Sequence, residues 1–217
     1  MSTQLSKYKA VIFDLDGVIT DTAHYHYLAW KRLADAVGAP FDEEFNEQLK
    51  GVDRMGSLEL ILARAPRSYS QQEKLALADA KNRHYQELIA TMTPGDLLPG
   101  ALEALDAVRA AGLKTGLASV SKNAFTVLDR LGIRERFDTV VDAATITHSK
   151  PHPEIFLTAA AQLGLDPGDC LGVEDAVAGV ASIKDAGMVA VGVGKPEVLA
   201  RADRVIGSMR EFRLADY

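Results

Sequence analysis

The sequence FDLDGVIT at residues 13–20 overlaps the end of an apolar run, Lys9–Leu15, that is typical of a strand buried on both faces. Asp14 and Asp16 are two residues apart, so in an extended segment their side chains point the same way. Gly17 then allows the backbone to turn sharply. Two carboxylates at the end of a buried strand are costly unless a cation or a proton separates them. The stretch alone leaves two interpretations open, such a site or an ordinary strand-ending turn.

Strand and helix patterns alternate through the rest of the chain outside residues 21–93. Further short apolar runs predict strands at Leu113–Ser119, Thr139–Asp142, Cys170–Glu174 and Met188–Val193. Helical patterns occupy Ala101–Ala111, Ala124–Leu131 and Pro153–Leu163, each with a glycine close to its end. This alternation predicts βαβ units and therefore an α/β fold with a doubly wound, Rossmann-like parallel sheet.

One long stretch, from Thr22 to Met92, contains no convincing strand pattern. Its helical patterns are Tyr25–Val37, Asp42–Leu49, Met55–Ala63 and Gln71–Ala90, separated by short breaks rich in Gly and Pro. We expect these residues to form a four-helix cap domain, residues 21–93, inserted into an α/β core made of residues 1–20 and 94–217.

Composition excludes several classes of function. The 217 residues include 24 basic and 30 acidic side chains, a formal net charge of −6, so no basic footprint for nucleic acid is present. No apolar run is long enough to span a membrane. The single cysteine, Cys170, rules out an intrachain disulfide and fits a reducing compartment. We therefore expect a cytoplasmic monomer with neither nucleic-acid nor membrane partners.

Three other strand ends carry polar residues. Ser119 ends the second strand with a hydroxyl, which is suited to donate to a phosphate oxygen. Lys150 precedes a proline that favours a loop, and its ammonium would neutralise both a phosphate and the carboxylates. Glu174 and Asp175 end a later strand. Singly these residues are a turn residue, a solvated charge and a helix-capping pair, but together they lie where open α/β sheets bind ligands.

These motifs, in this order, resemble the haloacid dehalogenase superfamily, and specifically its phosphotransferases with an early-inserted helical cap. The resemblance covers nearly the whole chain. It implies that Asp14 is the nucleophile that forms an aspartyl-phosphate and that Asp16 is the general acid and base. It also implies Mg²⁺ bound by Asp14, the Asp16 backbone carbonyl, Glu174 and Asp175, with Ser119 and Lys150 holding the phosphate.

Residues 21–30, 45–54 and 118–123 resemble the hexose-phosphate mutases of that superfamily, which interconvert β-glucose 1-phosphate and glucose 6-phosphate through β-glucose 1,6-bisphosphate. The resemblance implies that Thr22 and His26 form a hinge pair that positions Asp16. It implies that Arg54 holds the distal phosphate. The other substrate-binding residues implied are Trp30, Leu49, Lys50, Gly51, Val52, Ser57, Lys81, Ser119, Val120, Ser121, Lys122 and Asn123.

Two alternatives remain open. A sugar-phosphate phosphatase shares the four core motifs but does not need a second anion clamp such as Arg54. If the chain were a non-catalytic phosphosugar-binding protein, we would expect some of the carboxylates to be lost, but all of them are present here.

A metal site at His148 and His152 is disfavoured, because Pro151 and Pro153 disrupt the helical spacing that it would need.

Overall fold

A six-stranded parallel sheet lies at the centre of the computed structural model, which describes residues 7–49 and 52–217. The strands are β1 (Ala10–Phe13), β2 (Lys114–Leu117), β3 (Thr139–Val140), β4 (Cys170–Glu174), β5 (Val189–Val193) and β6 (Arg204–Ile206). Their order is β3-β2-β1-β4-β5-β6, and every pair is parallel. The order reverses between β1 and β4, where such sheets leave a crevice at the carboxyl ends of the strands. The expected doubly wound sheet is confirmed.

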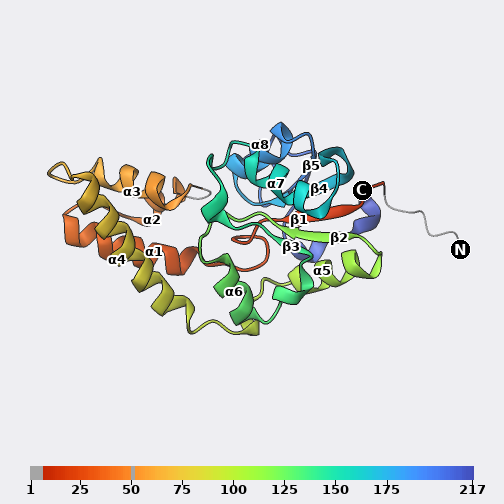
Figure 1. Cartoon of the computed structure of the whole chain (residues 1–217), viewed down its shortest axis with the longest axis horizontal. Helices are drawn as coiled ribbons and strands as arrows, with labels where there is room; N and C mark the ends of the chain where they lie inside the picture. The colour runs from red at the N-terminus through yellow and green to blue at the C-terminus, as the bar shows by residue number, and fades with distance from the viewer. Residues whose placement is uncertain (1–6, 50–51) are drawn as a thin grey trace, which may run out of the picture.

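Helices cover both faces of this sheet (Figure 1). On one face α5 (Ala101–Ala110) and α6 (Ala124–Leu131) pack with the chain that follows β6, and on the other lie α7 (Glu154–Leu163) and α8 (Val177–Asp185). Val11 and Phe13 of β1 face the first of these layers, whereas Ile12 faces the second. The continuous apolar run of β1 follows from this burial on both sides.

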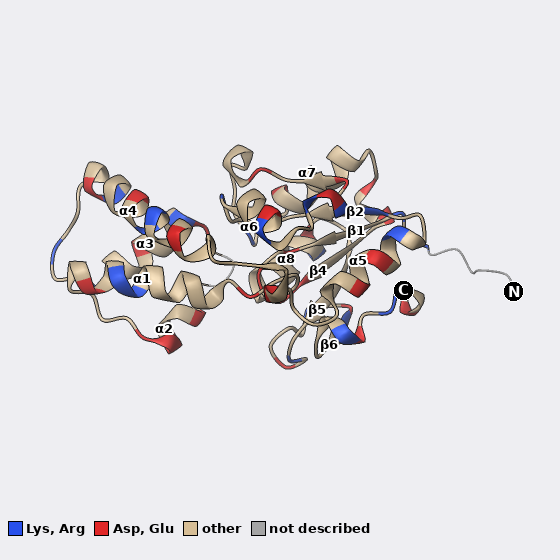
Figure 2. Ribbon diagram, turned by 90° about the horizontal axis from the view of Figure 1, so that it is seen from below, with Lys and Arg blue, Asp and Glu red and all other residues tan. Residues whose placement is uncertain are grey.

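The remaining helices form a second lobe to one side of the sheet (Figures 1 and 2). They are α1 (Ala23–Val37), α2 (Glu43–Glu47), α3 (Arg54–Leu62) and α4 (Gln71–Ile89). The lobe has its own apolar core, which includes Trp30, Leu58 and Ile61. The last turns of α4 instead contribute Tyr85 and Ile89 to the core that lies against the sheet. Helix α4 therefore links the interior of the cap to the interior of the main lobe.

Short 3₁₀ turns connect many of these elements: η1 (Pro94–Asp96), η2 (Arg134–Arg136), η3 (Ala143–Thr145), η4 (Pro167–Asp169), η5 (Met209–Glu211) and η6 (Leu214–Asp216). None of the described helices is long and apolar enough to cross a membrane.

The structure differs from the sequence expectations mainly at the ends of elements. Strand β1 stops at Phe13 rather than Leu15, because the backbone of residues 15–20 forms its own tight turn. Strand β3 has two residues, since Asp142 caps the following 3₁₀ turn. The edge strand β6 and the helix α8 were not expected; β6 is only three residues long, and it begins with an exposed arginine.

Candidate active site

The carboxyl ends of β1, β2 and β4 lie side by side. Phe13 pairs with Leu117 on one side and with Val173 on the other, so the residues that follow these strands meet at one edge of the sheet. This register brings Asp14, Ser119 and Glu174 together from parts of the chain that are far apart in sequence. All three side chains are buried.

Lys150 lies between two of these carboxylates. Its Nζ is 2.6 Å from Oδ1 of Asp14 and 2.7 Å from Oε2 of Glu174, and its side chain is 1% exposed. Burial opposes the charge on this ammonium, but Asp14 and Glu174 outweigh burial and raise the pKa of Lys150 above its ordinary value. Burial, together with the charge on Asp14, raises the pKa of Glu174. The interpretation of Lys150 as a solvated charge is therefore wrong.

Gly17 is required here for two independent reasons. Its φ of 74° lies in the left-handed region that side chains with a Cβ rarely adopt. A Cβ at this position would also collide with the carboxylate of Asp175. The turn after β1 therefore brings its backbone close to the acidic pair at the end of β4.

A divalent cation would fit at this edge. Asp14, Glu174 and Asp175 each offer a carboxylate oxygen, and these atoms lie within 4.8 Å of one another. One ammonium among three carboxylates leaves an excess of negative charge and a donor set made only of oxygen, which is what Mg²⁺ prefers. The side chain of Asp16 does not belong to this cluster.

The Asp16 side chain points instead to the start of the cap. Its Oδ1 accepts a hydrogen bond from the hydroxyl of Thr22, the residue that precedes α1. Burial and then the charge of Asp14 raise the pKa of Asp16 to about 7, while the Thr22 hydrogen bond opposes the shift. A carboxyl group with this pKa exchanges protons readily near neutral pH, which is what a general acid and base requires.

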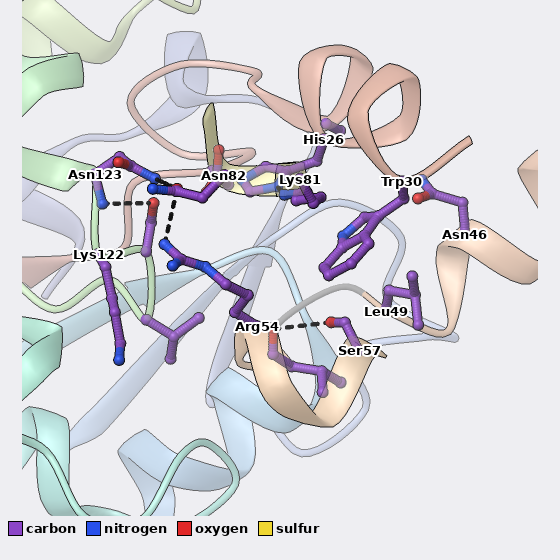
Figure 3. A pocket seen from close by; sticks show the side chains of 15 residues that line it. His26, Trp30, Asn46, Leu49, Arg54, Ser57, Lys81, Asn82, Lys122 and Asn123 are labelled. Carbon is purple, nitrogen blue, oxygen red and sulfur yellow. Dashed lines mark hydrogen bonds between the residues drawn. The ribbon is translucent and has the colours of Figure 1, made fainter. Parts of the chain in front are cut away.

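A pocket of about 750 Å³, counting its open mouth, lies between the two lobes (Figure 3). The predicted site residues that line it are Asp16, His26, Trp30, Leu49, Val52, Arg54, Ser57, Lys81, Val120, Ser121, Lys122 and Asn123. Lys50 and Gly51 lie outside the described residues. Six predicted residues do not line the pocket. Thr22 is bonded to Asp16, and the others lie at the edge of the sheet: Asp14, Ser119, Lys150, Glu174 and Asp175.

The cap wall of this pocket is basic. Nη2 of Arg54 donates to Oδ1 of Asn82 at 2.8 Å, and Asn123 of the core donates to the same oxygen at 2.9 Å (Figure 3). Nζ of Lys81 lies 2.9 Å from Nδ1 of His26. Burial, followed by the charge of Arg54, lowers the pKa of Lys81 to about 7.

Burial also lowers the pKa of His26 well below its usual range, with help from the charges of Lys81 and Arg54. His26 is therefore neutral, and a hydrogen bond joins its Nδ1 to Nζ of Lys81.

Several residues of the site were missed from the sequence. Asn82 joins Arg54 to Asn123, and Tyr85 stacks on His26 with ring centroids 4.1 Å apart. Both lie close to Lys81 on α4. Residues four apart on a helix share a face, so the prediction of Lys81 as a site residue could have been extended to Tyr85. Asn46 and Ala23, which also line the pocket, carry no such signal.

The argument against a metal site at His148 and His152 was that two prolines disrupt the helical spacing such a site would need. The structure shows that this argument is wrong, because the ligand atoms come together without a helix. The loop itself turns, and it brings ligand atoms of His148, His152 and Glu154 within 4.8 Å of one another without any helical spacing. The Glu154 carboxylate accepts hydrogen bonds from two backbone N–H groups and from the His148 ring. These contacts brace the loop that carries Lys150.

Fold and site together define a doubly wound α/β enzyme whose acidic, lysine-bridged centre faces a helical cap. The profile of the haloacid dehalogenase-like hydrolases matches residues 8–187, and the chain belongs to this family. It is 50% identical over 208 residues to a β-phosphoglucomutase of Bacillus subtilis (strain 168), covering 95% of this chain and 92% of that one. It is 32% identical to hexitol phosphatase B of Escherichia coli (strain K12), covering 95% of each chain.

A solved structure supports the same relationship. The crystal structure of β-phosphoglucomutase from Clostridium difficile superposes with a TM-score of 0.94 at 47% identity, covering 96% of this chain and 95% of that one.

Proposed function

We propose that this chain is a β-phosphoglucomutase, which interconverts β-D-glucose 1-phosphate and glucose 6-phosphate through β-glucose 1,6-bisphosphate. The observation that carries the proposal is a pocket with a functional group from each lobe: Asp16, next to the acidic centre, on the core side, and the guanidinium of Arg54, held by Asn82, on the cap side. A sugar bisphosphate has an anionic group at each end, so it needs an anion site at both. The relationship to the Bacillus subtilis enzyme supports this assignment over the phosphatase alternative.

In the proposed mechanism phosphorylated Asp14 first donates its phosphoryl group to β-glucose 1-phosphate, which gives the bisphosphate, and later accepts the other phosphoryl group from it. Lys150, 2.6 Å from Asp14, neutralises charge as the phosphoryl group transfers. The hydroxyl of Ser119 accepts a hydrogen bond from the Ser121 N–H, which leaves its own proton to donate to a phosphate oxygen. Mg²⁺ held by Asp14, Glu174, Asp175 and the Asp16 carbonyl would offset the negative charge of the phosphoryl oxygens.

Asp16 handles the proton of the sugar hydroxyl. Its pKa of about 7 allows it to deprotonate the attacking hydroxyl and then to protonate the leaving oxygen. Thr22 holds its carboxylate, and His26 with Lys81 forms the adjoining wall. After the first transfer the bisphosphate turns over, so that Arg54 receives the phosphate that has just left the core.

The cap residues set which alcohol attacks the aspartyl-phosphate. Trp30, Leu49, Val52 and Ser57 line the part of the pocket where the sugar ring would lie. Their closure around a hexose excludes water, so that transfer to sugar outcompetes hydrolysis. We also propose that the enzyme works as a cytoplasmic monomer on small sugar phosphates.

The test combines the protein with Mg²⁺, β-glucose 1-phosphate and a trace of β-glucose 1,6-bisphosphate, and follows both glucose 6-phosphate and inorganic phosphate. We expect net formation of glucose 6-phosphate with little phosphate release. Phosphate release at a comparable rate would overturn the proposal in favour of a sugar-phosphate phosphatase. The Asp14→Asn variant is the control, and it should form neither product.

A further inference from the structure

Two imidazoles and a carboxylate gather on the surface loop that carries Lys150. Nδ1 of His148 lies 2.8 Å from Oε2 of Glu154, and Nδ1 of His152 lies 3.9 Å from the same oxygen. The centroids of the two imidazole rings are 4.5 Å apart. Within residues 7–49 and 52–217, only one other group of three such side chains could hold a metal ion. That group is the acidic centre at the sheet edge: Asp14, Glu174 and Asp175.

The separations between the ligand atoms suit a tetrahedral metal ion. Zn²⁺ binds nitrogen and oxygen at about 2.0–2.2 Å, so neighbouring ligand atoms around it lie about 3.3–3.6 Å apart. The distances from the two imidazoles to Oε2 of Glu154, 2.8 and 3.9 Å, lie on either side of this value. The side chains of His148 and His152 are 62% and 50% exposed, so they are free to rotate by the small amount that remains.

The backbone that carries these side chains is held from two sides. Oγ of Ser182, on α8, donates to the backbone carbonyl of His152 at 2.8 Å. Glu154 is the first residue of α7, and its carboxylate accepts from the backbone N–H groups of Thr147 and His148 at 2.7 and 2.8 Å. Ligands that are positioned before the metal arrives lose less conformational freedom when it binds.

Each imidazole can offer a nitrogen lone pair to the metal. Nδ1 of His152 accepts a hydrogen bond of 3.3 Å from the backbone N–H of Glu154, so this nitrogen carries no proton. Nδ1 of His148 donates to the Glu154 carboxylate. A metal ion would take the place of that proton, which passes to solvent.

We propose that His148, His152 and Glu154 form a second metal site, which binds Zn²⁺ in preference to Mg²⁺. Imidazole is a ligand of choice for zinc, whereas Mg²⁺ takes oxygen ligands and keeps several waters. The acidic centre offers oxygen alone and therefore suits the other ion. Three protein ligands around Zn²⁺ leave the fourth position to water.

The site has a consequence for the loop that connects its ligands. Lys150 lies between His148 and His152 in the chain, and its Nζ bonds two carboxylates of the acidic centre. The ligand atoms are already close together in this arrangement of the loop. Zn²⁺ therefore fastens the loop to the start of α7 in the form that holds Lys150 at the sheet edge.

The test titrates Zn²⁺ by calorimetry into the untagged chain in an excess of Mg²⁺, which competes for the acidic centre. We expect one equivalent of Zn²⁺ to bind to the wild type. His148→Ala and His152→Ala should each raise the Kd at least about tenfold, because loss of a ligand costs no less than loss of a residue that merely supports one. Both side chains are exposed, so neither substitution disturbs the core.

His84→Ala is the matched control. His84 is a partly exposed imidazole beside a carboxylate, Glu87, and its ring is bonded to Arg32. Among the residues that the structure describes, it belongs to no group of three possible metal ligands. The Kd of this variant for Zn²⁺ should equal that of the wild type.

Hydrogen exchange tests the effect on the loop. Zn²⁺ should slow the exchange of backbone N–H groups in residues 147–154 of the wild type and leave it unchanged in His152→Ala. No binding of Zn²⁺ in excess Mg²⁺, or a Kd unchanged in both histidine variants, overturns the site. Binding that does not slow exchange in residues 147–154 overturns the fastening of the loop. Neither outcome depends on the proposed mutase activity.

Discussion

The edge of the sheet and the cap wall of the pocket carry opposite imbalances of charge. At the edge, the ammonium of Lys150 bonds two carboxylates, those of Asp14 and Glu174, and Asp175 adds a third close to them. On the cap wall, burial and then the charge of Arg54 lower the pKa of Lys81, and His26 beside them is neutral. Each region is electrostatically incomplete. The edge needs a cation and the wall needs an anion, which is the pattern expected of a site for a metal-dependent phosphoryl transfer.

The largest expected effect comes from removing the only described cation at the sheet edge. Lys150→Met leaves Asp14 and Glu174 buried without their ammonium. We expect a loss of about 3–5 kcal/mol in the free energy of unfolding, measured by urea denaturation, because breaking one partner of a buried ion pair strands the other charges. We also expect Mg²⁺ to stabilise this variant more than the wild type, since it would supply the missing positive charge.

Lys184→Met is the matched control. Lys184 pairs with Asp203 at 2.7 Å, the same separation as in the buried pair, but both side chains are partly exposed. We expect this variant to lose about 0–1 kcal/mol in the free energy of unfolding, as for most surface ion pairs. Equal losses in the two variants would show that burial does not distinguish the sheet edge from the surface.

The second expected effect concerns the anion site of the cap. Arg54→Ala should lower kcat/KM for β-glucose 1-phosphate by roughly 100-fold, because truncating one charge of a desolvated pair costs about 2–5 kcal/mol. Hydrolysis of p-nitrophenyl phosphate, which has no second anionic group, should change little. The kcat/KM of Arg54→Lys for β-glucose 1-phosphate should lie between those of the wild type and of Arg54→Ala, since an ammonium keeps the charge but loses the planar fork of the guanidinium.

The control for this prediction is Arg64→Ala, in the same lobe. The Arg64 guanidinium lies over the ring of Phe45, 4.1 Å from its centroid, and is exposed to solvent. The Arg64→Ala variant should keep its activities toward β-glucose 1-phosphate and p-nitrophenyl phosphate near those of the wild type. An Arg54→Ala variant that lost both activities equally would show that Arg54 supports the cap structure and has no dedicated role toward the distal phosphate.

The sequence predicted the two regions to different extents, for a physical reason. Asp14, Ser119 and Glu174 could be placed together because the ends of parallel strands must meet at one edge, whatever the packing details. On the cap, the contact of Asn82 with both Arg54 and Asn123 depends on how α3, α4 and the core loop pack. No local pattern encodes that packing, and the partner of Arg54 was missed although Arg54 itself was predicted.

The smallest expected effect is a pH dependence that distinguishes the cap wall from the edge. The pKa of Lys81 is about 7 in the folded protein, against 10.5 ordinarily, chiefly because the side chain is buried. Between these values the unfolded chain binds more protons than the folded one, so stability rises with pH. The penalty for the buried charge is absent above pH 10.5, grows as the pH falls, and is complete below about 7.

In urea denaturation between pH 7.5 and about 9.5, the wild type should therefore gain stability relative to Lys81→Met as the pH rises, by about 1.4 kcal/mol per pH unit at most. Lys74→Met, on the same helix in an ion pair with Glu59, is the control and should follow the wild type. Saturating glucose 6-phosphate sharpens the comparison. An anion on the cap wall favours the charged form of Lys81, so the difference in pH slope should shrink. A slope unaffected by the ligand would mean that Lys81 does not face the bound sugar phosphate, and that the positive charge of this wall serves the packing of the cap.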